Sequence, residues 1–252
     1  MQSRLGRCWG RALRIAGILA ALVASCVPPD DGQPHPGWEL PFPGGSATND
    51  TGSSPGVVVI GDSLMQAGDD YRNPVHAQQL ANGVRFFSGA SAFVAFAAAA
   101  TVSHFTRPWL MTAGPSTIQT YAATRAPRVL VIALGTNDVR LLTRSPAWGQ
   151  YTLTDFAGSL DTAIQSQQGR CVILVNVANH FPESDYSPNV VAVNGTLAAR
   201  TSPTVRLLDW DSASAPHPDW FLPGDIHHSP AGSAQYINLI RDAVNAALGS
   251  GC

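Results

Sequence analysis

The chain has 252 residues, a formal net charge of −2 and seven histidines, and only 13% of its residues are charged. An average soluble protein has roughly 25% charged residues. No Lys/Arg-rich run follows the N-terminal segment, which argues against nucleic-acid binding. The sequence has no Gly-rich loop ending in Lys-Ser or Lys-Thr, and the histidines lack the spacing of a zinc site. We therefore expect neither a metal nor an organic cofactor.

The first 26 residues have the pattern of an export signal. Four arginines precede an apolar stretch from Ile15 to Val23, which is too short to cross a membrane, since a span needs about 20 apolar residues. This arrangement predicts a secretory signal peptide. It ends in Val23-Ala24-Ser25-Cys26, which resembles a bacterial lipobox, and in such precursors the cysteine becomes the lipidated first residue. Ordinary cleavage that leaves Cys26 as a free thiol is the alternative.

Residues 27–56 are rich in Pro, Gly, Ser, Thr and Asp and have almost no aliphatic residues that could build a core. This composition predicts a disordered spacer, whose reach is on the order of 30 Å. The spacer would let a domain over residues 57–252 stand off a membrane. We therefore expect an exported protein of the cell envelope, anchored by lipid at the outer face of the membrane or otherwise secreted. A linker without any length requirement is the simpler alternative.

From residue 57 onward, apolar runs of strand length alternate with helical stretches. Strands are expected at Val57–Ile60, Val84–Phe87, Val129–Leu134, Cys171–Asn176 and Val205–Asp209. Helices are expected at Asn73–Ala81, part of Ala90–His104, Ser116–Arg125, Thr154–Gln168, Asn189–Thr201 and Pro230–Leu248. Ser229 can cap the last of these helices, and Pro230 suits its first position. Alternating strands and helices predict the α/β class, with a parallel sheet covered on both faces.

Polar side chains follow two of these strands and precede the last helix. Gly61-Asp62-Ser63-Leu64 comes directly after the first strand, and Gly135-Thr136-Asn137-Asp138 follows the third. The carboxyl ends of strands in an open α/β sheet face the crevice where ligands bind, so the Ser63 hydroxyl stands where a nucleophile is useful. Near the C-terminus come Asp225, His227 and His228.

These three segments, in this order, resemble the SGNH (GDSL-type) hydrolase family over roughly Val57 to Leu248. The resemblance implies a three-layer flavodoxin-like sandwich with a five-stranded parallel sheet in the order 2-1-3-4-5. It implies that Ser63 is the nucleophile and that an Asp and a His near the C-terminus complete a triad. It also implies an oxyanion hole formed by the backbone N–H groups of Ser63 and Gly89 and the side-chain amide of Asn137. Asp62, which precedes the nucleophile, is expected to be structural.

The general base can be chosen in two ways. Asp225-x-x-His228 has the acid–base spacing that is usual in the family. His227 instead keeps the family's spacing to the start of the last helix, although Asp225 then stands one residue late. We favour His227 as the base with Asp225 as the acid, because the helix start fixes the loop more firmly than the carboxylate does. His228 remains the alternative base, or else a solvated neighbour or pocket-wall residue, and Asp209 is the reserve acid.

Two of the four cysteines are candidates for a disulfide. Cys8 leaves with the signal peptide and Cys26 would carry lipid, so Cys171 and Cys252 remain, an even number in an oxidising compartment. A helix that runs antiparallel to its strands ends near their N-terminal ends. We therefore expect a Cys171–Cys252 bridge at the edge opposite the active site. A buried Cys171 thiol with Cys252 in a frayed tail is the alternative.

The sequence thus predicts a monomeric serine esterase that hydrolyses carboxylic esters through an acyl-enzyme at the cell envelope. Its substrate would be a small acyl ester, a lipid or an acylated glycan, and only the lipid anchor would contact the membrane. An O-deacetylase or acyltransferase of a cell-envelope glycan is the second candidate, because water and a sugar hydroxyl can accept the same acyl group. The irregular Asp/His spacing also leaves open a different class, a catalytically silent envelope-binding lipoprotein.

Overall fold

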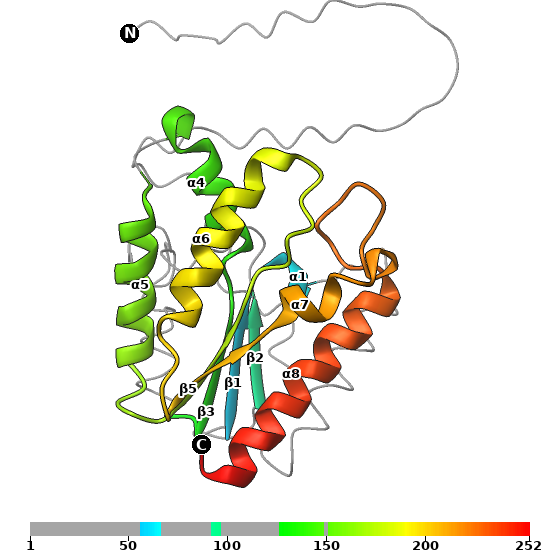
Figure 1. The fold of residues 1–252 in the computed structure, drawn as a ribbon. Coiled ribbons are helices and arrows are strands. Elements are labelled where there is room, and N and C mark those ends of the chain that lie inside the picture. Colours follow the sequence, from blue (N-terminus) through cyan, green and yellow to red (C-terminus); the bar gives the residue numbers. More distant parts are fainter. Residues whose placement is uncertain (1–55, 67–91, 97–125, 149–150) are drawn as a thin grey trace, which may run out of the picture.

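The computed structural model describes residues 56–66, 92–96, 126–148 and 151–252 (Figure 1). They form a five-stranded sheet in the order β2-β1-β3-β4-β5, in which every neighbouring pair is parallel. The strands are β1 Val57–Gly61, β2 Ala92–Phe96, β3 Val129–Ala133, β4 Cys171–Val175 and β5 Val205–Leu208. The predicted α/β class and strand order are confirmed.

Six α-helices and two short 3₁₀ helices lie within the described residues. The α-helices are α1 Ser63–Gln66, α4 Thr136–Trp148, α5 Leu153–Gln165, α6 Ser187–Ala198, α7 Trp210–Ser214 and α8 Pro230–Ser250. The 3₁₀ helices are η3 Ser184–Tyr186 and η4 Pro218–Trp220. Within this part of the chain, no helix has both the length and the hydropathy needed to span a bilayer.

The helices cover both faces of the sheet, with α8 on one face and α5 and α6 on the other (Figure 1). Alternate residues of β1, β3 and β4 point to opposite faces, as the pleat of a strand requires. On the α8 face, the sheet contributes Val57, Val59, Val129, Val131, Cys171 and Ile173 to the core. On the other face, it contributes Val58, Ile60, Leu130, Ile132, Val172 and Leu174. This is the predicted three-layer sandwich.

The second strand differs from the prediction. The expected strand Val84–Phe87 lies outside the described residues, as do the expected helices Asn73–Ala81 and Ser116–Arg125. The strand that pairs with β1 is Ala92–Phe96, within a stretch that was expected to hold part of a helix. A strand at these five residues was not expected, and residues 97–104 of that stretch lie outside the described residues. A short apolar run has no period that separates helix from strand, and the two Phe and the Val in it favour a strand.

Helix α4 was not predicted at all. The segment Gly135-Thr136-Asn137-Asp138 was expected only as a turn, but the structure starts a 13-residue helix at Thr136. Polar residues are frequent in the sequence of this helix, and a proline such as Pro146 disfavours a helix. Asp138 in its first turn suits the positive end of the helix dipole. Asn137 therefore stands in the first turn of a helix at the end of β3.

The start of α8 was predicted correctly. Ser229 is the N-cap and accepts a hydrogen bond from Gly232 N at 3.2 Å, and Pro230 occupies the first turn. A Cβ atom at Gly232 would collide with the backbone of Trp220, so η4 packs directly on the first turn of this helix. The loop between η4 and α8, which carries Asp225 and both histidines, is thereby held at each end.

Candidate active site

Ser63 lies just beyond the carboxyl end of β1 and is the first residue of α1. The turn between strand and helix is tight, because a Cβ atom at Gly61 would collide with the Met65 side chain. The carboxylate of Asp62 accepts a hydrogen bond from Leu64 N at 2.9 Å and so caps the short helix. The local sequence therefore fixes the backbone on both sides of the Ser63 hydroxyl.

His227 lies between Ser63 and Asp225. Its Nε2 atom is 3.1 Å from Ser63 Oγ, and its Nδ1 atom is 2.8 Å from Asp225 Oδ1. When Nδ1–H donates to the carboxylate, Nε2 is the unprotonated nitrogen that can accept the proton of the serine hydroxyl. Both distances lie in the range in which proton transfer to a general base is possible.

Asp225 reaches His227 although only one residue separates them. Its Oδ1 atom accepts from the backbone N–H of His227 at 3.2 Å as well as facing the ring. A turn closes this loop: Leu222 N donates to His227 O at 2.8 Å, and Asp225 N donates to Leu222 O at 3.0 Å. Gly224 takes a positive φ of 67° in this turn, which favours glycine. This local bond from the His227 backbone explains how the Asp225 carboxylate, although one residue late, still faces the His227 ring.

The pKa of Asp225 lies below its ordinary value. Partial burial of the carboxyl acts to raise this pKa, but the hydrogen bonds and the charge of His227 act against burial and outweigh it. Asp225 is therefore ionised at neutral pH and can stabilise an imidazolium on His227.

His228 points into the core instead. It is fully buried, and its ring centroid lies 5.1 Å from that of Trp210, 4.8 Å from Tyr236 and 5.6 Å from Phe221. The expectation of a solvated neighbour or pocket-wall residue is thus wrong. Phe221 and His228 form an isolated antiparallel bridge, so the chain is extended here, and successive side chains of an extended segment point to opposite sides.

Asp209, the reserve acid, has another position. It is the N-cap of α7, where its carboxylate accepts from Ser212 N at 3.0 Å and from Asn176 Nδ2 at 2.8 Å. Burial acts to raise its pKa, but these hydrogen bonds outweigh it and hold the pKa below its ordinary value. The carboxylate that faces His227 in the structure is that of Asp225.

Asn137 lies next to the Ser63 turn because β1 and β3 are neighbours, with Gly61 aligned to Ala133. Its side chain is 7% exposed, and its Nδ2 atom donates to Asp62 Oδ2 at 3.4 Å. Gly135 has a φ of 133°, and a Cβ atom there would lie 2.8 Å from Val177, so glycine is required in this turn. The third expected oxyanion donor, Gly89, lies outside the described residues.

Asp62 carries the most perturbed carboxyl near the site. It is fully buried, and burial is the main reason that its pKa rises to about 7. The hydrogen bond from Leu64 N acts to lower this pKa, whereas the charge of Asp138 acts to raise it. The Asp138 carboxylate in turn accepts from Tyr151 Oη at 2.6 Å. Two buried carboxyl groups thus lie beside Asn137.

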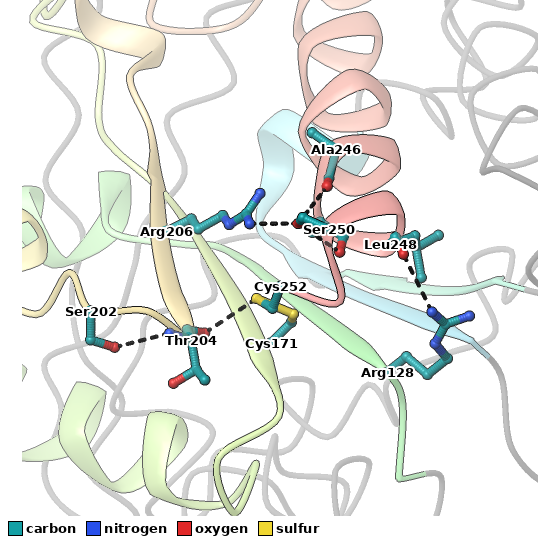
Figure 2. Close-up of a disulfide and its surroundings, with 10 residues drawn as sticks. Arg128, Cys171, Ser202, Thr204, Arg206, Ala246, Leu248, Ser250 and Cys252 are labelled. Carbon is teal, nitrogen blue, oxygen red and sulfur yellow. Dashed lines mark hydrogen bonds between the residues drawn. A yellow bond between two sulfur atoms is a disulfide. The ribbon is translucent and has the colours of Figure 1, made fainter.

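The two cysteines meet at the other edge of the sheet. Cys171 opens β4 and Cys252 follows α8, and their sulfur atoms are 2.06 Å apart with Cα atoms 5.6 Å apart (Figure 2). Ser250 Oγ accepts from Arg206 Nη2 at 2.7 Å and helps to hold the end of the helix. Figure 1 places this end of the chain at the edge of the sheet away from α1. In the structure, the bridge and Ser63 therefore lie at opposite edges.

Among the described residues, no group of three or more His, Cys, Asp or Glu side chains could hold a metal ion. The groups available for chemistry in this part of the chain are the Ser63 hydroxyl, the His227 imidazole and the Asn137 amide. They are joined by the partly buried carboxylate of Asp225 and the buried carboxyl groups of Asp62 and Asp138.

Several solved structures resemble the chain. A lipase/acylhydrolase from Enterococcus faecalis has a TM-score of 0.53 at 19% identity and covers 75% of this chain and 95% of its own. A catalytic mutant of the acetylxylan esterase Axe2 from Geobacillus stearothermophilus has a TM-score of 0.55 at 15% identity, with 77% and 95% covered. The catalytic domain of peptidoglycan O-acetyltransferase A from Streptococcus pneumoniae has a TM-score of 0.51 at 16% identity, with 79% and 97% covered. At such identities, the likeness shows the shared fold.

No curated protein matches the chain. The family description that does match is the GDSL-like Lipase/Acylhydrolase family, over residues 59–235. This match spans well over half of the chain and includes the Ser63 turn, the Asn137 turn and the loop with Asp225 and His227. The chain therefore belongs to the GDSL-like lipase/acylhydrolase family and is a serine ester hydrolase of the SGNH type.

Proposed function

We propose that the chain hydrolyses carboxylic esters through an acyl-enzyme on Ser63, with His227 as general base and Asp225 as the acid that orients it. The observation that carries this proposal is the hydrogen-bonded series from Asp225 through His227 to Ser63, with distances of 2.8 and 3.1 Å. A serine hydroxyl is a weak nucleophile until a base removes its proton. His227 Nε2 takes that proton as Ser63 Oγ bonds to the ester carbonyl carbon, and the Asp225 carboxylate stabilises the imidazolium.

The attack places a negative charge on the carbonyl oxygen, which needs donors already in position. We assign this role to the backbone N–H groups of Ser63 and Gly89 and to the Asn137 amide. One such donor contributes roughly 2.7–4 kcal/mol to the stabilisation of the transition state. The intermediate then collapses: the bond to the alkoxide breaks, and His227 returns its proton to the leaving alcohol. Water, activated by the same base, attacks the acyl-enzyme and releases the acid with Ser63 restored.

A fluorophosphonate probe tests this assignment directly, because it reacts with an activated serine. We expect intact-mass analysis to find one adduct on the wild type, on the peptide that contains Ser63, and none on a folded Ser63→Ala variant. Ser63→Ala should also abolish the hydrolysis of p-nitrophenyl acetate. A wild type that neither labels nor hydrolyses esters would instead favour the silent envelope-binding lipoprotein.

We also propose that the protein is exported and anchored through lipid on Cys26, with a signal peptide over residues 1–26, a spacer over 27–56 and the hydrolase domain over 57–252. The pattern of the N-terminal sequence supports this proposal, since it combines a basic segment, a short apolar stretch and a lipobox-like end. Cys26→Ala should move the protein from the membrane fraction to the soluble fraction with its esterase activity intact. Equal partition of the two proteins would argue for simple secretion.

A second candidate is the removal or transfer of an acetyl group on a cell-envelope glycan. Its support is the fold shared with the acetylxylan esterase and with the peptidoglycan O-acetyltransferase domain. Acetate release from acetylated xylan and from O-acetylated peptidoglycan, measured beside p-nitrophenyl acetate, separates glycan esters from simple ones. Mass spectrometry of the products in the presence of a sugar acceptor distinguishes transfer from hydrolysis.

A further inference from the structure

Asp62 joins the nucleophile turn to the Asn137 amide. The carboxylate accepts at both of its oxygens: Oδ1 takes the N–H of Leu64 at 2.9 Å, and Oδ2 takes the Nδ2–H of Asn137 at 3.4 Å. The side chain is fully buried. One carboxylate is thus bonded both to the turn that carries Ser63 and to a proposed oxyanion donor.

Capping alone does not account for this residue. The helix that Asp62 caps, α1, has four residues, and Ser or Asn can cap a helix about as well without a charge. Burying a carboxylate is destabilising unless its hydrogen bonds compensate. Here burial and the nearby charge of Asp138 both raise the pKa, and on the α8 side the charge of Asp62 helps to raise the pKa of Tyr236. A charged group in this position suggests a role that a neutral cap would not fill.

We propose that Asp62 is a positioning residue that fixes which end of the Asn137 amide faces the oxyanion. The inference rests on the proposed function, since it requires that Asn137 is an oxyanion donor. An amide has an NH₂ end and an oxygen end of nearly the same shape, and the two can exchange places by a half-turn. Above pH 7 Asp62 is ionised in the folded protein, and a carboxylate only accepts, so it holds the NH₂ end. With one N–H directed at Asp62, the second N–H is the group that serves the oxyanion.

An Asp62→Asn substitution should reverse this arrangement. The new amide has one oxygen and one NH₂ group, whereas the site presents two N–H donors. The backbone N–H of Leu64 cannot turn away, so the new oxygen faces Leu64 and the new NH₂ group faces Asn137. Asn137 satisfies the new NH₂ group by turning its own oxygen toward position 62. After this half-turn, the oxygen of Asn137 occupies the place of its NH₂ group, so the donor is lost from the oxyanion hole.

Asp62→Ser separates positioning from capping. A serine hydroxyl still accepts from the Leu64 N–H as a normal helix cap. Its side chain is one atom shorter than that of Asp, so it falls short of Asn137. This variant therefore keeps the cap of α1 but removes the carboxyl group and its contact with the amide, and it also serves if Asp62→Asn fails to fold.

The test is a double-mutant cycle on the full-length protein with p-nitrophenyl acetate above pH 7, where Asp62 is ionised. The proteins are the wild type, Asp62→Asn, Asp62→Ser, Asn137→Ala and the two double variants. We expect each Asp62 variant to lower kcat about 10-fold to 100-fold in the wild-type background, with KM within about threefold. In the Asn137→Ala background, we expect the same substitutions to change kcat by less than about threefold, because the amide that Asp62 orients is gone.

The possible outcomes separate this inference from the proposed function. An active wild type with the same loss of kcat in both backgrounds would show that Asp62 does not act through Asn137. An unchanged kcat in Asp62→Ser would overturn the inference equally. A wild type with no esterase activity and no fluorophosphonate adduct would overturn the proposed function, and this inference with it.

Discussion

The buried carboxyl of Asp62 makes a prediction about stability that is independent of catalysis. Burial raises its pKa in the folded protein to about 7, whereas an unperturbed Asp has a pKa of 3.8. Above pH 7 the folded protein therefore contains a buried charge that the unfolded chain carries at no penalty. Asp62→Asn removes this charge while keeping the size of the side chain. We expect the variant to be less active but more stable than the wild type in alkaline buffer.

The sign and size follow from proton linkage. Between pH 4 and pH 7 the unfolded chain has already lost the Asp62 proton, whereas the folded protein still holds it. The folded state binds more protons, so the free energy of unfolding falls as the pH rises. The slope is about 1.4 kcal/mol per pH unit, and the full loss is about 4 kcal/mol. In the variant, Asn137 turns its oxygen toward the new NH₂ group and the hydrogen bond is kept, so the variant should be up to about 4 kcal/mol more stable than the wild type above pH 8.

Urea unfolding of the wild type and Asp62→Asn at several pH values measures this difference. Other titrating groups are the same in the two proteins, so they cancel when the free energies of unfolding are subtracted. We expect the wild type to lose about 3 kcal/mol relative to the variant between pH 5 and pH 8. A difference that does not change with pH would mean that Asp62 titrates near its ordinary value, and the argument from burial would be refuted.

Three further predictions concern the other proposed roles. Asn137→Ala should lower kcat roughly 10²-fold to 10³-fold with a smaller effect on KM; a raised KM at unchanged kcat would make it a ground-state binding residue. His227→Ala should lower kcat by roughly 10⁴-fold or more, whereas His228→Ala, in the aromatic core, should mainly lower the thermal midpoint. A larger loss of kcat in His228→Ala than in His227→Ala would reverse the assignment of the base. Replacing Cys171 and Cys252 by Ser should cost about 4 kcal/mol of stability in the chain-entropy model for a separation of 81 residues, with kcat unchanged; two free thiols in the exported protein would reject the bridge.

Much of the fold could be predicted because its signals are local. The strands β1, β3 and β4 consist mostly of Val, Ile and Leu, and such runs predict buried strands whatever surrounds them. The fourth correctly predicted strand, β5, is shorter and contains Arg206. The order of the strands is not local, and it came from the family resemblance. Ala92–Phe96 was not recognised as a strand because a short apolar run has no period that separates helix from strand, and its pairing with β1 is not a local signal.

The site was less predictable than the fold. The spacing of Asp225, His227 and His228 supports two bases, and the choice depends on which side of an extended segment faces the core. The sequence contains a partial signal of burial, since the aromatic residues Phe221 and Tyr236 lie on either side of His228 in the chain. That these rings pack around His228 is seen only in the tertiary structure. The Asp62–Asn137 bond joins residues 75 apart, which meet because β1 and β3 are neighbours. No local pattern reports such a contact. Asp62 was expected to be structural because it precedes the nucleophile.

The structure separates residues that stabilise the protein from residues that are placed for chemistry, and α8 connects the two. Its first turn carries the Ser229 cap and packs Gly232 on Trp220, so it positions the loop that holds His227 beside Ser63. Its last turn ends in the disulfide at the opposite edge of the sheet. Opening the bridge frays the end that is remote from His227, so stability should fall without a change in kcat.

Asp62 presents the reverse case, because the buried charge that orients the site also lowers the free energy of unfolding. Enzymes often keep such destabilised groups where activity depends on them. The two sets of variants should accordingly move stability and kcat independently, the cysteines affecting only stability and Asp62→Asn raising stability while lowering kcat.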